Sequence, residues 1–109
     1  MAKDNYVFVH HMLDCIRKIE THAGSMTYEE FLQSEWDQDG VFRNLEIIGE
    51  AANKIDARFL SENPEVPWKD IIGMRNKLVH DYFGLELEKV WNTVQDDLPV
   101  LKVQLEKLL

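Results

Sequence analysis

The sequence contains a single cysteine and no long apolar run. With Cys15 alone, the 109-residue chain can form neither an internal disulfide nor a thiolate metal cluster, and its apolar helical position indicates a buried thiol. No apolar stretch approaches the ~20 residues that cross a bilayer, and the N-terminus lacks the apolar core of a signal peptide. We therefore expect a cytoplasmic protein without a membrane partner.

Basic residues are scarce as well. Twelve Lys and Arg against 20 Asp and Glu give a formal net charge of −8, which argues against a protein that binds bulk duplex by neutralising phosphates. Residues 1–40 carry three basic and eight acidic side chains, residues 41–80 carry six of each, and residues 81–109 carry three and six. A nucleic-acid site would therefore be a small, preorganised pocket built from the neutral middle segment.

The length, with 45% apolar and 29% charged residues, predicts one folded domain over residues 1–109. Apolar residues recur at steps of three and four, the spacing of one helix face, and no segment shows strand-like alternation between turns. The sequence predicts an all-α fold, an up-and-down bundle of four to five helices. The three clearest stripes are Phe8, Met12, Cys15, Ile16 and Ile19; Val41, Leu45, Ile48, Ala52, Ile55 and Phe59; and Val90, Val94, Leu98, Leu101, Leu105 and Leu108.

Capping residues set the expected helix ends in the N-terminal half. Residues 4–5 can cap the first helix, which should end near Gly24. Thr27 and Glu30 have the spacing of a capping box and predict a short helix. The second stripe begins directly after residues 37–40.

Prolines and small residues organise the C-terminal half. The segment 49–52 contains three small residues, Gly49, Ala51 and Ala52, and offers a surface that another helix can approach closely. The segment Asn63–Pro67 is a helix breaker, and Pro67 suits the first position of a helix that ends near Gly84. Pro99 should break or kink the last helix, with Asp96 or Asp97 capping its second half.

Four side chains capable of RNA chemistry gather near the end of the helix that follows Pro67. Asn76 and His80 are spaced i,i+4, and Arg75 and Tyr82 share an adjoining face. An arginine fork can hold a phosphate through two charge-assisted hydrogen bonds, and histidine exchanges protons near neutrality. Together they fit metal-free RNA cleavage, in which a base activates the 2′-OH, an acid protonates the leaving 5′ oxygen and a cation stabilises the charge between them.

Structural interpretations of the same residues remain open at this point. Arg75 could form a salt bridge, His80 could be favoured at a helix C-terminus by the dipole, and Tyr82 could pack at the edge of the core. His80 with Asp81 could also be the metal-binding doublet of an HD-type phosphohydrolase, although such a site needs further histidines from other helices.

Three other groups of polar or aromatic residues are expected to be structural. The histidines at positions 10, 11 and 22 have no suitable neighbouring ligand, and the acidic cluster is typical of a solvated face rather than a cation site. The three tryptophans favour packing in the core or at a dimer interface over base stacking. The acidic cluster is Glu29, Glu30, Glu35, Asp37 and Asp39, and the tryptophans are Trp36, Trp68 and Trp91.

The sequence resembles the HepT-like family of the HEPN superfamily, small helical ribonucleases that act as toxins in prokaryotic toxin–antitoxin pairs. The resemblance spans about residues 5–105 and includes the Arg-x4-His-x-Tyr motif at Arg75, His80 and Tyr82, with Asn76 as the polar residue after the arginine. The segments that carry it are Arg43–Ala52, Pro67-Trp68, Ile72–Gly84, Val90-Trp91 and Leu98-Pro99.

This resemblance implies a C2 homodimer in which two Arg/His motifs line one cleft. It implies that Arg75 binds the scissile phosphate, that His80 is the general acid/base, and that Asn76 orients the phosphate or the imidazole. It further implies a type VII-like toxin that cleaves RNA, with tRNA among the candidate substrates, without a metal or other cofactor. A partner nucleotidyltransferase of the MntA type would silence it by transferring AMP to Tyr82.

Two function classes are compatible with this sequence. The first is a metal-independent endoribonuclease. The second is a catalytically inactive binding partner or substrate of a minimal nucleotidyltransferase. The apolar stripes exceed what one thin bundle buries, which independently favours a dimer.

Overall fold

The computed structural model describes residues 4–80 and 86–109, with the backbone alone for residues 79 and 80. All regular structure in these residues is helical, which confirms the all-α prediction. The elements are α1 (Asn5–Ala23), α2 (Tyr28–Gln33), α3 (Glu35–Lys54), α4 (Ala57–Glu62), α5 (Trp68–His80), α6 (Leu87–Asn92), the π-helical turn η2 (Thr93–Asp97) and α7 (Leu98–Glu106).

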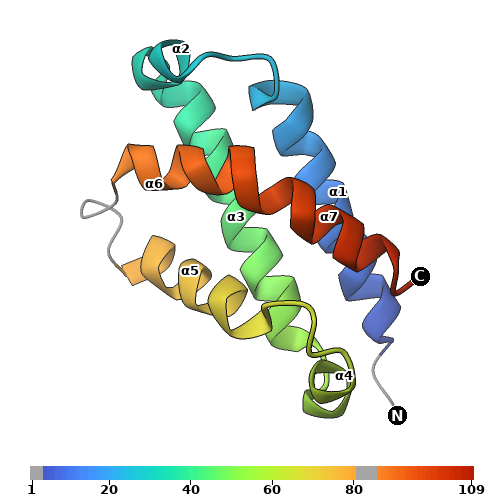
Figure 1. The fold of residues 1–109 in the computed structure, drawn as a ribbon. Coiled ribbons are helices and arrows are strands. Elements are labelled where there is room, and N and C mark those ends of the chain that lie inside the picture. Colours follow the sequence, from blue (N-terminus) through green and yellow to red (C-terminus); the bar gives the residue numbers. More distant parts are fainter. Residues whose placement is uncertain (1–3, 81–85) are drawn as a thin grey trace.

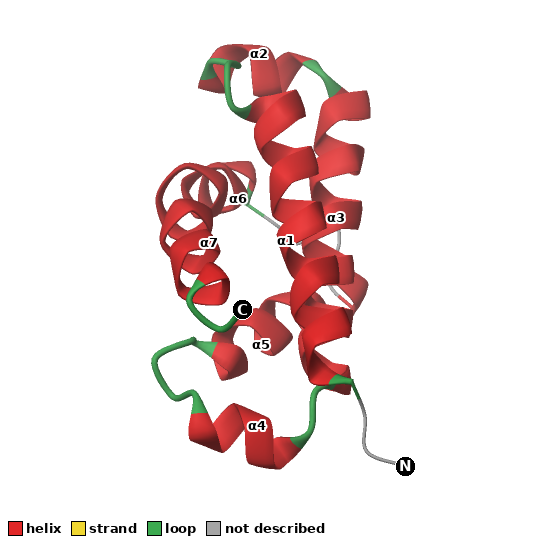
Figure 2. Ribbon diagram, turned by 90° about the vertical axis from the view of Figure 1, so that its right-hand side faces the viewer, coloured by secondary structure: helices red, strands yellow, loops and turns green. Residues whose placement is uncertain are grey.

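The helices form two layers. α1 and α3 lie side by side and antiparallel, and they form one layer (Figure 1). α5 and the α6–η2–α7 segment lie together on one face of that layer (Figure 2). The apolar stripes meet between the layers, where Ile16 of α1, Ile48 of α3 and Leu105 of α7 are at most 2% exposed. The short helices α2 and α4 lie at opposite ends of the long helix α3 (Figure 1).

The expected N-terminal caps are present. The Asp4 side chain accepts hydrogen bonds from the first backbone N–H groups of α1, and Gly24 ends that helix. At α2, Thr27 Oγ1 accepts from the Glu30 N–H at 3.1 Å, and the Glu30 carboxylate accepts from the Thr27 N–H at 2.9 Å. This reciprocal pair is the predicted capping box.

Helix α3 does not coincide with the apolar stripe that runs from Val41 to Phe59. Helix α3 begins at Glu35, because Ser34 Oγ accepts the Asp37 N–H at 3.2 Å and caps it, so residues 37–40 belong to the helix. The helix ends at Lys54, and the next turn is held where the Asp56 N–H donates to Asn5 Oδ1 at 3.1 Å. The last residue of the stripe, Phe59, therefore lies on α4, after the chain has turned at Ile55.

Of the break or kink predicted at Pro99, the break does not occur. The π-helical turn η2 joins α6 to α7 without a break, and the Leu98 N–H bonds to the Thr93 carbonyl across the wider turn. The nitrogen of Pro99 carries no hydrogen and cannot donate a helical hydrogen bond, and the wider π-helical turn accommodates the proline ring. Asp97 precedes α7 but makes no side-chain cap, so neither predicted aspartate caps the second half. Pro67 lies one residue before α5 and not at its first position.

No helix within residues 4–80 and 86–109 combines the length and the apolar character that a bilayer-spanning segment requires.

Phe31→Ala is expected to lower the free energy of unfolding by about 3–5 kcal/mol, the usual effect of removing a buried aromatic ring. Phe31 is fully buried, and its ring centroid lies 5.2 Å from that of Trp91, so it ties α2 to α6. Urea denaturation measures the change. The matched control is Leu32→Ala, because the neighbouring Leu32 is 41% exposed and its loss should change stability by less than about 1 kcal/mol. Equal effects of the two substitutions would contradict this packing.

Candidate active site

Helix α5 carries most of the predicted motif, and its start is firmly anchored. Trp68, 6% exposed, donates from its indole Nε1 to the Asn63 carbonyl at 2.9 Å, which fixes the turn that follows α4. From Trp68 the helix continues without interruption to His80. Arg75, Asn76 and the backbone of His80 are therefore held in one rigid register, with Asn76 and His80 one turn apart.

Arg75 sits where α5 comes closest to α3. An added Cβ at Gly49 of α3 would overlap the Arg75 side chain at its Cβ and lie 3.1 Å from the Ile71 carbonyl oxygen. Only glycine leaves room for this contact, so the predicted close approach at residues 49–52 is confirmed. The residue that fills the space is Arg75, which the sequence did not indicate.

The guanidinium of Arg75 is only partly satisfied. Its Nη1 donates to Asn76 Oδ1 at 3.0 Å, in an exposed hydrogen bond. Its Nε is buried and has no hydrogen-bond partner among the described residues. A buried donor without an acceptor costs about 1–3 kcal/mol, and more when the group is charged. The arginine is thus held at the surface in a conformation that its own contacts do not fully stabilise.

No ion pair to Arg75 occurs within the described residues. The structural interpretation of Arg75 as a salt-bridge residue therefore has no support in this part of the chain. An arginine whose charge no described residue neutralises, and whose fork is partly oriented by a neighbouring amide, is suited to bind an anionic oxygen group.

The exposed face of α5 continues the polar character of the site. Lys69, Gly73 and Asn76 are exposed at helical spacing, and His80 follows in the same register. Lys77 is exposed beside them. This side of α5 carries two lysines and an amide, and the exposed carboxylate of Asp70 lies one residue from Lys69 and two turns before Lys77.

Part of the predicted site lies outside the described residues. The His80 side chain, Tyr82 and the expected helix end at Gly84 fall there, as does Asp81 of the alternative metal doublet. The structure therefore brings Arg75 and Asn76 together and places the His80 backbone on the same helix, while the convergence of guanidinium and imidazole stays a prediction.

The sequence matches the family described as "Ribonuclease HepT-like" over residues 12–108. The chain belongs to the HepT-like ribonuclease family. A relative in Thermococcus cleftensis, named "Probable ribonuclease HepT", is 38% identical over 99% of this chain and 98% of its own length. A Methanocaldococcus jannaschii relative, named provisionally as an RNase, is 35% identical over 98% of this chain and 88% of its own. No solved structure matches.

Another Methanocaldococcus jannaschii relative is 36% identical over the whole of this chain but over only 49% of its own length. Its name joins a gamma-glutamylcyclotransferase to an RNase. The HepT-like unit thus occurs both alone and next to another enzyme. Membership in this family supports endoribonuclease activity.

The tryptophans of this HepT-like chain divide into two kinds. Trp68 is buried and Trp91 packs against Phe31 and Tyr28, as predicted for core residues. Trp36 is 87% exposed, so it does not pack in the core, and a place at a dimer interface stays a prediction for it. The cause is the earlier start of α3, which puts Trp36 in the first turn on the solvent side.

The remaining candidates behave as structural residues. Cys15 is buried, and burial raises the pKa of its thiol, which lowers the thiolate fraction near neutrality. Members of the acidic cluster make local bonds, Glu30 in the capping box and Asp37 with Ser34. Across the described ranges, no three His, Cys, Asp or Glu side chains gather in a way that could hold a metal ion.

Proposed function

We propose that this HepT-like protein is a metal-independent endoribonuclease in which Arg75 and His80 act on one phosphodiester. The observation that carries the proposal is how the Arg75 guanidinium is positioned and which of its hydrogen-bonding groups lack partners among the described residues. Its guanidinium is positioned by Gly49 and Asn76, has a buried unpartnered Nε, and meets no carboxylate in the described chain. A phosphate oxygen on the exposed Nη1 side of the guanidinium would supply the negative charge that no described residue provides.

The reaction follows from the chemistry of the two side chains. A neutral imidazole of His80 takes the proton of the ribose 2′-OH, and the 2′ oxygen attacks the adjacent phosphorus. The bond from phosphorus to the 5′ oxygen breaks, and a protonated imidazole gives that oxygen its proton. Arg75 stabilises the charge on the phosphoryl oxygens as it develops, and Asn76 keeps the guanidinium oriented. The products are a 2′,3′-cyclic phosphate and a 5′-OH.

The acid and base steps require two histidines, and one chain supplies a single motif. A C2 homodimer that joins two α5 helix ends would provide both, with two Arg75 side chains beside them. Asn76 is exposed and Arg75 is half-buried, which leaves this part of α5 accessible to an RNA backbone from solvent.

The experiment is cleavage of single-stranded and loop-containing RNA by the purified protein in excess EDTA, with analysis of the product ends. We expect cleavage that leaves 2′,3′-cyclic phosphate. A strict requirement for a divalent metal, or products with 3′-OH ends, would refute the mechanism. No cleavage of any RNA would favour the second function class, an inactive substrate of a nucleotidyltransferase.

Tyr82 is proposed as the acceptor of AMP from an MntA-type nucleotidyltransferase. Its phenolic oxygen attacks the α-phosphorus of ATP, pyrophosphate leaves, and the adduct adds bulk and negative charge close to the phosphate site. Incubation with that enzyme and ATP should raise the intact mass by one or more AMP units and abolish RNA cleavage. Tyr82→Phe should show neither change. An equal mass increase in that variant would place the modification on another residue.

A further inference from the structure

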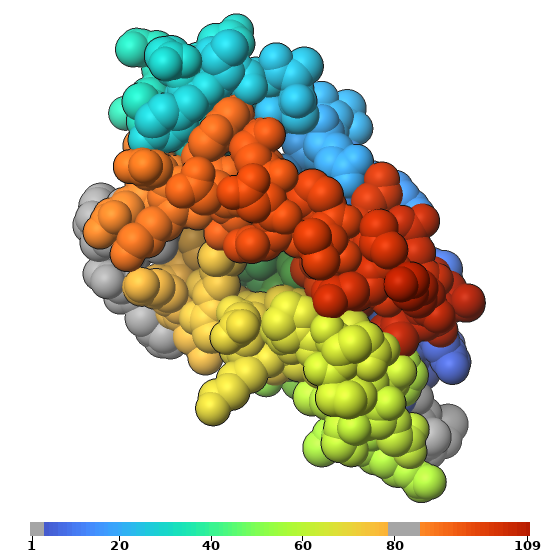
Figure 3. All heavy atoms as spheres, viewed as in Figure 1, coloured from blue at the N-terminus to red at the C-terminus, as the bar shows by residue number. Residues whose placement is uncertain are grey.

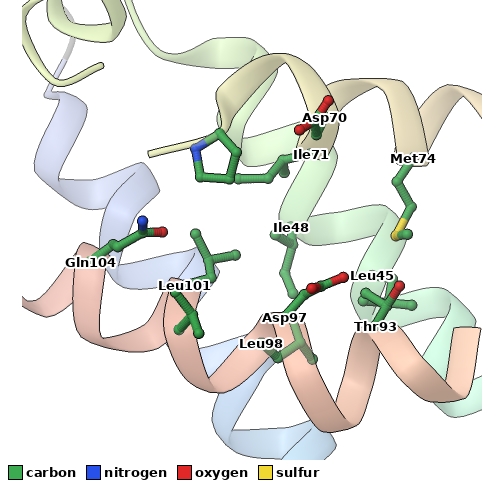
Figure 4. Close-up of a pocket in the computed structure, with 12 residues that line it drawn as sticks. Leu45, Ile48, Asp70, Ile71, Met74, Thr93, Asp97, Leu98, Leu101 and Gln104 are labelled. Carbon is green, nitrogen blue, oxygen red and sulfur yellow. The ribbon is translucent and has the colours of Figure 1, made fainter. Parts of the chain in front are cut away.

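A cleft of about 300 Å³ lies between α5 and the η2–α7 segment (Figure 3). It exists because α5 packs against α3 and α7 packs against α1, which leaves the space between α5 and α7 open. Its base is formed by α3, and both walls contribute apolar side chains (Figure 4). These are Leu45 and Ile48 at the base, Ile71 and Met74 on one wall, and Leu98 and Leu101 on the other.

The apolar surface of the cleft continues outward onto α7. Val100 lines the cleft and is 58% exposed, and Val103 one turn further along is 51% exposed. Ile71 and Met74 on the opposite wall are half-buried. A concave apolar surface between two helices, with exposed apolar residues at its edge, has the form of a groove that takes the anchor side chains of an amphipathic helix.

The charged residues that line the cleft are acidic, and they favour a positively charged binding partner. Asp70 and Asp97 line it, both are exposed, and neither forms an ion pair or side-chain hydrogen bond within the described residues. In the same part of the chain, no Lys, Arg or His lines the cleft. These carboxylates repel RNA phosphates. A second copy, with its net charge of −8, would bring further negative charge to the same surface.

We propose that this cleft binds an amphipathic helix of a protein partner whose apolar stripe is flanked by Lys or Arg. Apolar side chains at i, i+3 and i+7 enter the cleft over Ile48 and Leu101, and the flanking cations lie against Asp70 and Asp97. Arg75 and Asn76 do not line the cleft, so the partner binds without covering the phosphate site. The proposal does not depend on nuclease activity.

The test uses synthetic helical peptides with leucine at i, i+3 and i+7, flanked by Lys, by Gln or by Glu. Their binding to the whole protein is followed by fluorescence anisotropy, and the binding surface is located by NMR amide shifts. We expect the Lys-flanked peptide to bind with shifts at the cleft residues, the Gln-flanked one more weakly, and the Glu-flanked one weakest.

Charge reversal supplies the matched control. The double variant D70K/D97K is expected to bind the Lys-flanked peptide about tenfold more weakly. D96K should bind it as the unaltered protein does, because Asp96 is the exposed neighbour of Asp97 and does not line the cleft.

Each alternative outcome overturns the proposal. If no Lys-flanked peptide binds, the cleft does not bind an amphipathic helix. If the Glu-flanked peptide binds as tightly as the Lys-flanked one, Asp70 and Asp97 do not select a cationic partner. If D70K/D97K without peptide differed from the unaltered protein in oligomeric state, as measured by sedimentation, the cleft would be assigned to a second copy of the chain. Displacement of the peptide by single-stranded RNA would assign it to nucleic acid. RNA cleavage by D70K/D97K should equal that of D96K, which keeps this test separate from the proposed nuclease.

Discussion

Replacing Arg75 with alanine is expected to lower the rate of RNA cleavage by about 100-fold or more. In the proposed mechanism the guanidinium neutralises charge on the reacting phosphate, and loss of one such donor typically costs about 10²–10³ in rate. The fold should survive, because the substitution removes a buried Nε that has no acceptor among the described residues. Initial rates on one RNA, with thermal melting in parallel, measure both effects.

Two variants make the Arg75 result specific. Arg75→Lys keeps the charge but loses the fork that bonds Asn76, so it should recover only part of the rate. Lys77→Ala removes an exposed cation from the same helix and should lower RNA binding only slightly. If Arg75→Ala and Lys77→Ala reduced cleavage equally, Arg75 would be contributing general charge and not acting on the scissile phosphate.

Gly49→Ala is expected to destabilise the protein by about 1–3 kcal/mol, although alanine is the better helix former by about 1 kcal/mol. The added Cβ would overlap the Arg75 side chain and press on the Ile71 carbonyl, which is backbone and cannot rotate away. α5 must therefore shift away from α3, and Arg75 moves with it. The unfolding free energy from urea denaturation and the cleavage rate should both fall.

The control for Gly49 lies on the opposing helix. An added Cβ at Gly73 of α5 meets nothing within 4 Å, and this residue is exposed. Gly73→Ala should therefore stabilise the protein by about 0.5–1 kcal/mol. If Gly49→Ala gave a similar gain, the close contact that positions Arg75 would not exist in solution.

Features that depend on neighbouring residues in the chain could be predicted from the sequence. The α1 end at Gly24 and the capping box at Thr27 are local hydrogen-bond patterns, so residue types alone identified them, and they limited the α1 cap to Asp4 or Asn5. The packing stripes could also be predicted, because burial follows the helical period. The turn at Ile55 could not, since it is held by Asn5, 51 residues away from its partner Asp56.

The candidate site was predicted in composition but not in geometry. The motif spacing identified Arg75 and Asn76, and the small residues near Gly49 indicated a close helix approach. That Arg75 itself fills this approach depends on the rotation of α5 against α3, which no local pattern encodes. The carboxylate-lined cleft was missed for the same reason, because Asp70 and Asp97 come from separate helices.

Titration calorimetry with an RNA oligonucleotide that carries a single 2′-deoxy sugar at the cleavage position gives the most direct test of a shared site. Without the 2′-OH the strand binds but cannot be cut, so the stoichiometry reports how many chains surround one phosphodiester. We expect one strand per two chains, binding that Arg75→Ala weakens strongly, and binding that His80→Ala retains. One strand per chain, or affinity indifferent to Arg75, would contradict a site shared by two chains.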